Sequence, residues 1–137
     1  MQKPRDNSGV VGQKPVLLVV DDYPTMLKML SQALEAEGYS VLAASDATEA
    51  LKLAAENQSL ILVVLEMEAT TTAIEICRRL RKFSDVPVII AVSTNEEEDM
   101  ANCLDAGADD FIRKPFTVAE FLATVQVVLR HSDHQSK

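Results

Sequence analysis

Hydrophobic residues along the chain fall into segments of two alternating kinds. Three segments are apolar throughout, at residues 16–20, 60–65 and 86–92. Strands that are apolar on both faces are typical of parallel sheets covered by helices on both sides. Two shorter segments, 40–44 and 110–113, are candidates for two more strands.

Helical spacing of apolar residues occupies the stretches between these strands. Residues 24–37 place Leu27, Leu30 and Leu34 on one face, and Gly38 is positioned to end the helix. Similar patterns predict four more helices: 48–57, 72–83, from near residue 95 to Gly107, and 117–130.

Polar residues mark the expected starts of several helices. Thr72 with Glu75, and Thr117 with Glu120, have the spacing of a capping box. Acidic residues crowd the first turn of the fourth helix, where negative charge suits the helix dipole. These are Glu96, Glu97, Glu98 and Asp99.

The order of elements is strand then helix, repeated five times. Short connections and right-handed crossovers then predict a three-layer α/β/α sandwich. We assign residues 15–130 to this single domain. Residues 1–14 lack periodicity and are interpreted as a flexible N-terminal tail, and residues 131–137 as a C-terminal tail.

Composition and charge exclude several classes of function. The 13 basic and 21 acidic residues give a net charge of −8, which argues against direct nucleic-acid binding by this domain and against docking on anionic membranes. The sequence has no apolar run near the ~20 residues of a membrane span and no signal peptide. Its two cysteines, Cys77 and Cys103, are interpreted as reduced core residues, so we expect a cytoplasmic protein.

Open parallel sheets form their sites at the carboxyl ends of the strands. Residues that could carry chemistry are therefore sought directly after each predicted strand. Asp21 and Asp22 follow the first strand, Glu66 the third, and Lys114 the fifth. Three carboxylates brought together repel one another unless a cation lies among them, and oxygen ligands of this kind suit Mg²⁺. We therefore expect Mg²⁺ as the candidate cofactor, with Lys114 available to a phosphoryl group.

Other kinds of site fit the sequence less well. No glycine-rich loop follows the first strand, which counts against a P-loop or a dinucleotide site. Both histidines, His131 and His134, lie in the expected tail, so a Ser/His/Asp triad is not expected. A small phosphohydrolase that uses an aspartate after the first strand ranks low, because Asp21 and Asp22 are adjacent rather than spaced as Asp-x-Asp.

Five segments together resemble a known family. They are VLLVVDD (16–22), GYSVLAA (38–44), TEAL (48–51), AGADDFI (106–112) and KPF (114–116). In these segments the chain resembles the receiver domain of two-component response regulators, over about residues 15–130. The resemblance implies a flavodoxin-like fold with a five-stranded parallel sheet in the order 2-1-3-4-5.

The resemblance also implies roles for particular residues. Asp21 and Asp22 match the acidic pair that holds Mg²⁺, together with the residue at position 66. Lys114 matches the lysine that contacts the phosphoryl group, and its bond to the following proline is usually cis in the family. Phe111 matches the aromatic switch position. Receivers accept a phosphoryl group from a histidine kinase on an aspartate after the third strand, and are not enzymes with turnover.

The acceptor position is the main departure from the family, because it holds Glu66 instead of aspartate. The extra methylene moves the carboxylate outward by roughly 1.5 Å. Phosphoryl transfer depends on close positioning, so such a shift is costly. The longer side chain could also meet Lys114 directly.

Two further departures surround the same site. Counting back from Lys114 without a gap places Val92 where the family has a switch Thr or Ser, and valine cannot donate a hydrogen bond. Ser93 could replace it only through a shift or bulge of one residue. The loop after Glu66 lacks the usual Pro and Gly and is shorter.

These departures favour an atypical receiver, or pseudo-receiver, that is phosphorylated weakly or not at all and acts through protein contacts. The alternative is a conventional Mg²⁺-dependent receiver. Expected partners are a histidine kinase or another signalling protein, and an output domain outside this chain. If the domain dimerises, we expect the face of the fourth helix, fifth strand and fifth helix to be used, with Asp109 and Arg113 in it.

Overall fold

The computed structural model of the chain describes residues 13–93 and 97–135. Its five strands form one parallel sheet in the order β2-β1-β3-β4-β5. The strands are β1 (Val16–Asp21), β2 (Ser40–Ala44), β3 (Leu62–Glu66), β4 (Val88–Val92) and β5 (Asp110–Arg113). The predicted fold class and strand order are therefore confirmed.

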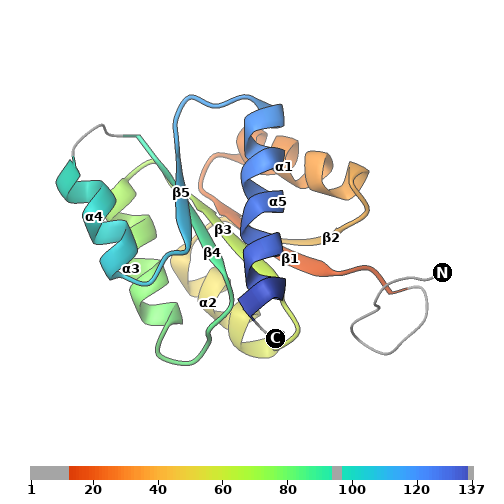
Figure 1. Cartoon of the computed structure of the whole chain (residues 1–137), viewed down its shortest axis with the longest axis horizontal. Coiled ribbons are helices and arrows are strands. Elements are labelled where there is room, and N and C mark those ends of the chain that lie inside the picture. The colour runs from red at the N-terminus through yellow and green to blue at the C-terminus, as the bar shows by residue number, and fades with distance from the viewer. Residues whose placement is uncertain (1–12, 94–96, 136–137) are drawn as a thin grey trace.

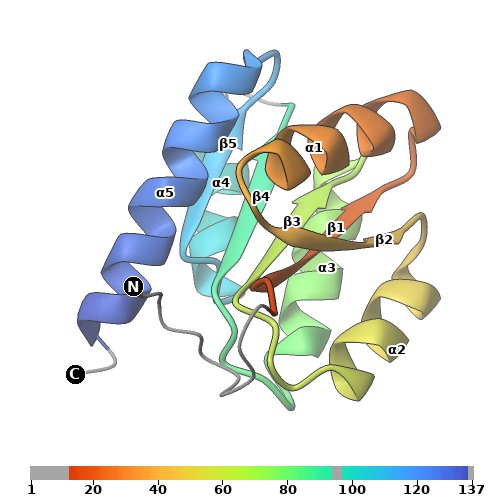
Figure 2. The same cartoon turned by 90° about the vertical axis from the view of Figure 1, so that its right-hand side faces the viewer.

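Helices cover both faces of the sheet and make the three predicted layers (Figure 1). Helices α1 (Pro24–Ala36) and α5 (Val118–Gln135) lie on one face. Helices α2 (Ala47–Glu56), α3 (Thr70–Leu80) and α4 (Glu97–Asp105) lie on the other. Figure 2 looks onto the face of the sheet that α1 and α5 cover, with α3 and α4 behind the strands.

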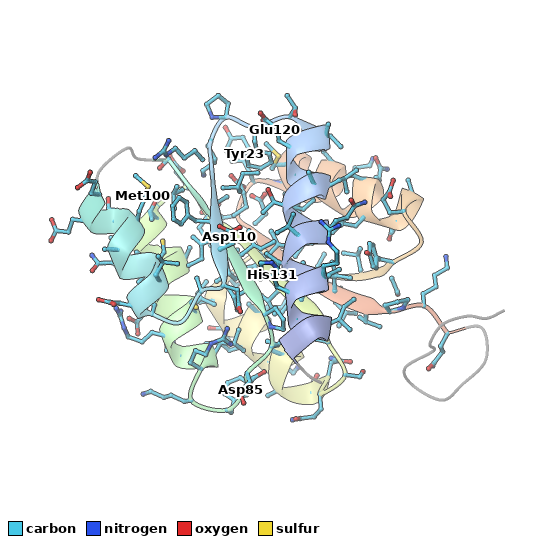
Figure 3. The ribbon with its side chains drawn as sticks, viewed as in Figure 1. Tyr23, Asp85, Met100, Asp110, Glu120 and His131 are labelled. Atoms are coloured by element: carbon cyan, nitrogen blue, oxygen red, sulfur yellow. The ribbon has the colours of Figure 1, made fainter. Side chains whose placement is uncertain are left out.

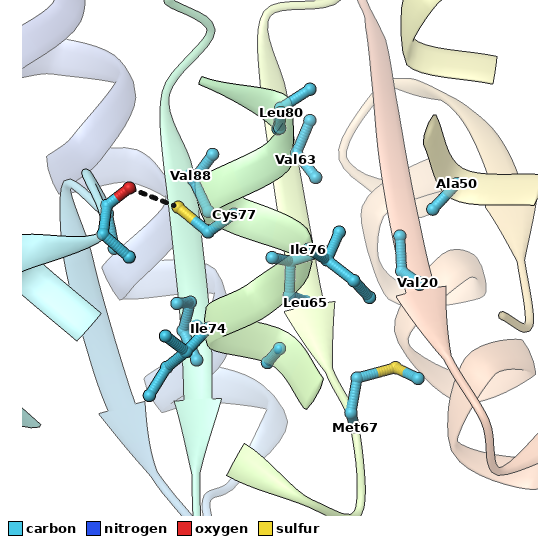
Figure 4. Close-up of a cluster of buried hydrophobic side chains, with 14 of the residues drawn as sticks. Val20, Ala50, Val63, Leu65, Met67, Ile74, Ile76, Cys77, Leu80 and Val88 are labelled. Carbon is cyan, nitrogen blue, oxygen red and sulfur yellow. Dashed lines mark hydrogen bonds between the residues drawn. The ribbon is translucent and has the colours of Figure 1, made fainter. Parts of the chain in front are cut away.

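The apolar strands are explained by two separate cores. Alternate residues of β1 point to opposite faces, so Leu17 and Val19 pack with α1 and α5, while Leu18 and Val20 pack with α2 and α3. The second core is drawn in Figure 4, where Ile74, Ile76, Cys77 and Leu80 of α3 lie against β3 and β4. A strand between two helical layers must be apolar at every position, as the sequence indicated.

One of the two predicted capping boxes is present at a helix start and the other is not. The Thr117–Glu120 capping box is present: Glu120 N–H donates to Thr117 Oγ1 at 3.0 Å, and Thr117 N–H donates to Glu120 Oε1 at 2.8 Å. The capping box predicted at Thr72 is wrong. Helix α3 begins at Thr70, whose side chain is buried, so Thr72 already lies inside the first turn.

Helix ends also differ from the prediction. Helix α5 continues to Gln135, so residues 131–135, which were expected to be a tail, are helical. The predicted start of the fourth helix near residue 95 lies outside the described residues, as do most of the N-terminal tail and the last two residues. Strands β3 and β4 each begin two residues later than expected.

Arg81 makes a cluster of hydrogen bonds at the end of the sheet that lies opposite to the strand carboxyl ends. Its Nε and Nη2 donate to the carbonyl of Gly107 at 3.1 and 2.8 Å, and Nη2 also meets Asp109 Oδ1 at 3.1 Å. Asp109 Oδ1 in turn accepts the N–H of Val88 at 2.8 Å. Arg81 therefore connects the end of α3 to the loop before β5.

Within the described part of the chain, no helix is both long and apolar enough to cross a membrane.

Candidate functional site

The site lies at the carboxyl ends of the strands and begins with two neighbouring carboxylates. Asp21 is the last residue of β1 and Glu66 the last residue of β3, and the strand register pairs them directly. Both are buried, with exposed fractions of 0% and 5%. Two acidic side chains are thus held side by side in a region where charge is costly.

Lys114 supplies the positive charge. It follows β5, and its backbone N–H donates to the carbonyl of Val92 at 2.8 Å. Its Nζ lies 2.9 Å from Oε2 of Glu66 and donates to the carbonyl oxygen of Met67 at 2.9 Å. The Lys114–Pro115 peptide bond is cis, as the resemblance implied. A charged hydrogen bond in a largely buried place is among the stronger polar contacts of a protein.

Asp21 lies beside Glu66 on the neighbouring strand. Its Oδ1 accepts the N–H of Tyr23 at 2.8 Å, whereas Oδ2 has no hydrogen-bond partner among the described residues. Burial, and then the neighbouring Glu66 carboxyl group, raise the pKa of Asp21 to about 8. A proton on Asp21 at neutral pH therefore relieves the repulsion between the two carboxyl groups.

A pocket of about 270 Å³ opens above these residues. Asp22 lies at its rim, where its exposed carboxylate accepts the N–H of Glu68 at 3.1 Å. Tyr23, also at this rim, is 63% exposed and appears at the same end of the molecule as Glu120 in Figure 3, with Asp85 at the opposite end. The lining residues are Asp22, Tyr23, Met26, Glu66, Glu68 and Lys114.

The three carboxylates expected to hold Mg²⁺ have different partners in the structure. Within the described residues, no group of three or more His, Cys, Asp or Glu side chains is placed to hold a metal ion. The physical reason is that Glu66 Oε2 is bound to Lys114 and that Asp22 is turned to the Glu68 N–H. Asp21 Oδ2 is buried and accepts no hydrogen bond from the described residues.

Val92 and Ser93, the two residues considered for the switch position, have different surroundings. Val92 is fully buried at the end of β4, and its carbonyl accepts the Lys114 N–H at 2.8 Å. Ser93 is exposed, and its N–H and Oγ lie 3.4 and 3.5 Å from Thr70 Oγ1. Phe111 is half-buried and packs against the same core as Val92.

Two participants were not predicted from the sequence. The Met67 carbonyl carries no side-chain signal, because any residue supplies that oxygen. Thr70 was passed over because the helix was expected to begin at Thr72, and its contact with Ser93 joins segments that are 23 residues apart.

Comparison with known proteins decides the family. Residues 17–126 match the family model of the response regulator receiver domain. This chain is a response regulator receiver domain. The match covers the strands and helices that build the site described above, including Asp21, Glu66 and Lys114.

Curated relatives extend this picture. The receiver is 37% identical over 117 residues to response regulator MprA of Mycobacterium sp. (strain KMS), covering 85% of this chain and 51% of MprA. It is 37% identical over 118 residues to the alkaline phosphatase synthesis transcriptional regulatory protein PhoP of Bacillus subtilis (strain 168), covering 85% of this chain and 49% of PhoP. The chain therefore spans about half the length of these relatives.

Solved structures show the same architecture. A CheY-like response regulator receiver domain protein from Methanospirillum hungatei JF-1 superimposes with a TM-score of 0.80 and 26% identity, covering 90% of this chain and 99% of that one. A putative two-component system response regulator/GGDEF domain protein gives a TM-score of 0.78 and 27% identity, covering 88% of this chain and 51% of that one.

Proposed function

We propose that this receiver signals through protein contacts without depending on phosphorylation of its acceptor position. The observation that carries the proposal is the ion pair of 2.9 Å between Lys114 Nζ and Glu66 Oε2. In this arrangement the acceptor carboxylate and the phosphoryl-binding lysine are already bound to each other. The domain is then held in one state by its own side chains.

The ion pair opposes the chemistry of phosphoryl transfer. An acceptor oxygen must approach phosphorus in line, and the surrounding charges must stabilise the transferring group. Oε2 of Glu66 instead has an ammonium group in hydrogen-bond contact, which reduces its nucleophilicity. The same contact withdraws Lys114 from an incoming phosphoryl oxygen.

The switch region supports the same conclusion. A valine at position 92 has no hydrogen-bond donor for a phosphoryl oxygen. The nearest hydroxyl along the chain, that of Ser93, lies beside Thr70 instead. Val92 and Phe111 share one apolar core, so their contacts form without any phosphate.

The partner of such a domain is another signalling protein. Exposed apolar side chains on α4 and α5, those of Leu104, Val118 and Val127, offer contact area for a histidine kinase, another signalling protein or a second copy of this chain. Because the chain spans about half of relatives that are named as regulators, an output domain in the whole protein is part of this proposal.

Dimerisation through α4, β5 and α5 is best tested at Arg113. Asp109, the other residue expected in this face, accepts the N–H of Val88 and meets Arg81, so reversing its charge would disturb the fold as well. Arg113 is exposed, and its recorded side-chain contact is with Met100 Sδ at 3.5 Å. Arg113→Glu should lower the sedimentation coefficient if this face joins two copies, and an unchanged value contradicts that face.

The conventional alternative also has an observation in its favour. Asp21, Asp22 and Lys114 all lie at one edge of the sheet, where a working receiver needs them. In that case Glu66, or a residue close to it, would accept the phosphoryl group with the help of Mg²⁺.

Intact mass after incubation with acetyl phosphate and Mg²⁺ distinguishes the two functions. The wild type should gain no stoichiometric phosphoryl group, and Glu66→Asp should gain more label than the wild type because the shorter side chain releases Lys114. Glu68→Asp, which shortens an acidic residue at the rim of the same pocket, is the matched control and should behave as the wild type. Stoichiometric label on wild-type Glu66 overturns the proposal.

A further inference from the structure

We propose that an exposed patch at the end of α3 is a docking surface for an acidic segment of a partner protein. The patch, called the basic–aromatic patch below, consists of Arg78, Arg79, Lys82 and Phe83. It lies where α3 runs into the loop before β4, at the end of the sheet opposite to the carboxyl ends of the strands (Figure 1). A partner segment bound there lies away from the Glu66–Lys114 ion pair.

The four side chains of the patch share one side of a helical segment. Backbone hydrogen bonds continue the turns of α3 through residues 81–83. Arg78 and Lys82 are four residues apart, and so are Arg79 and Phe83. Side chains at this spacing are neighbours on a helix, so the patch is one continuous surface.

Most of the positive charge of the patch is not neutralised by the protein itself. Arg78 Nη1 lies 3.5 Å from Glu75 Oε1, but both side chains are more than half exposed, and such a pair contributes little. Among the described residues, Arg79 and Lys82 take part in no ion pair. Carboxylates of another molecule can therefore approach three cationic groups, on a chain whose net charge is −8.

Arg81, the fourth basic residue of this segment, is used inside the protein instead. Its side chain is 21% exposed, against 52% for that of Arg78. Nη1 donates to the carbonyl of Ser84 at 3.2 Å, and Nη2 donates to the carbonyl of Gly107 at 2.8 Å. These bonds fix the turn that carries the patch, so a partner meets a pre-formed surface and loses less free energy in ordering it.

Phe83 adds an apolar contact to the charge. Its side chain is 44% exposed, although phenylalanine is among the residues most often buried. Basic residues at the end of α3 also complement the helix dipole, but the dipole gives no reason for an exposed aromatic ring beside them. Aromatic and Arg side chains are enriched at the centres of protein interfaces, and Arg binds carboxylates through two parallel hydrogen bonds. The patch thus fits a segment that carries both carboxylates and apolar side chains.

A protein segment fits this patch better than a nucleic acid does. The chain carries 21 acidic residues against 13 basic ones, and nucleic-acid affinity depends on an extended basic surface. The remaining surface therefore repels a long polyphosphate. A short acidic segment lies within a Debye length, ~10 Å, of the patch and is screened from most of that repulsion.

Fluorescence anisotropy of a fluorescein-labelled peptide, in which glutamates are interspersed with leucines, tests the patch. Arg79→Gln/Lys82→Gln should weaken binding by at least about fivefold relative to the wild type, and Phe83→Ser by at least about twofold. Lys28→Gln/Lys52→Gln removes the same charge from exposed positions of α1 and α2, so it is the matched control and should bind as the wild type does. The wild type should bind a peptide with glutamine in place of glutamate more weakly.

Four results overturn the proposal. They are no measurable binding of the acidic peptide to the wild type, an equal loss in the control variant, tighter binding of a duplex DNA through the same residues, and a wild-type dimer in sedimentation that dissociates in Arg79→Gln/Lys82→Gln. If a patch variant fails to fold, the wild type alone still gives a test. Added NaCl should weaken its binding of the acidic peptide, and binding that is insensitive to salt contradicts the proposal.

The outcome is separate from that of the phosphorylation test. Arg79→Gln/Lys82→Gln should give the same mass as its unmodified form after incubation with acetyl phosphate and Mg²⁺, as the wild type should. Failure of peptide binding overturns only the docking surface, and stoichiometric label on Glu66 overturns only the proposed function.

Discussion

Glu66 Oε2 and Lys114 Nζ meet at 2.9 Å across the end of strand β4, which lies between their own strands in the sheet. Neighbouring strands lie ~4.8 Å apart, so the two side chains together span a gap of roughly 10 Å. Because glutamate has one more methylene than aspartate, the distance that the lysine side chain must span is shorter. An ion pair thus joins Glu66, the last residue of β3, to Lys114, which follows β5.

The first prediction concerns stability. Lys114→Met should lower the free energy of unfolding by about 2–3 kcal/mol in metal-free buffer, because it leaves buried Glu66 without its counter-charge beside Asp21. Lys52→Met, at an exposed lysine of α2, should change the free energy of unfolding by less than about 0.5 kcal/mol. Urea unfolding measures both, and equal effects of the two substitutions would show that the ion pair contributes nothing.

A second prediction follows from the pKa of Asp21, which burial and Glu66 raise from 3.8 to about 8. The folded state then binds more protons than the unfolded state between these values, so stability falls as the pH rises from about 4 to about 8. With EDTA present, Asp21→Asn should remove most of this loss and be the more stable protein near pH 8. Asp22→Asn, at the exposed neighbour, should keep the wild-type dependence.

The measurement is urea unfolding of the three proteins at several pH values. If Asp21→Asn loses stability with pH as steeply as the wild type does, Asp21 is not the group that titrates.

The cysteines give a third prediction. Both thiols are buried, Cys77 Sγ lies 3.5 Å from the carbonyl of Ala106, and burial raises the pKa of Cys103 to about 11. Because the thiolate is the reactive form, the folded protein should react with a thiol reagent far more slowly than the protein in urea. Complete labelling of the folded protein at the rate seen in urea would contradict this burial.

Arg81 gives the fourth prediction. Arg81→Lys should destabilise the fold by about 1–2 kcal/mol, because lysine cannot reproduce the forked bonds to Gly107 and Asp109. Arg79→Lys, at an exposed position of the same helix, should change stability by less than about 0.5 kcal/mol. Thermal unfolding of both variants tests this, and equal midpoints would mean that the bridge has no net effect.

Gly107 can be tested independently of the arginine. Its φ is +103°, and a Cβ built on it would lie 2.8 Å from Arg81 Cγ. Gly107→Ala should therefore destabilise through both backbone strain and the clash, by about 1–3 kcal/mol. A neutral effect would show that the loop before β5 relaxes freely.

Much of the fold follows from the sequence because its signals are local. Fully apolar strands such as β1 require two helical layers, and the Thr117–Glu120 capping box is complete within four residues. The start of α3 was misplaced because several threonines in a row offer equal capping signals. Burial of Thr70, which depends on packing against the rest of the domain, decides between them.

The sequence predicts which residues form the site, but not which of their atoms contact one another. Asp21, Glu66 and Lys114 could be placed at one edge from strand order alone. That Glu66 pairs with Lys114, and that Met67 supplies a second oxygen, depends on distances across three strands. The sequence likewise could not show that Arg81 is engaged, because its partners Gly107 and Asp109 lie more than 25 residues away.

We propose that the Glu66–Lys114 ion pair takes the place of phosphorylation in this receiver. Its most direct test is the stoichiometry of phosphoryl transfer from acetyl phosphate, with Mg²⁺ present, read by intact mass for the wild type beside Glu66→Asp. The wild type should stay unmodified, and Glu66→Asp should show a measurable gain in mass. A wild type that takes up one phosphoryl group per chain, located on Glu66, would contradict it.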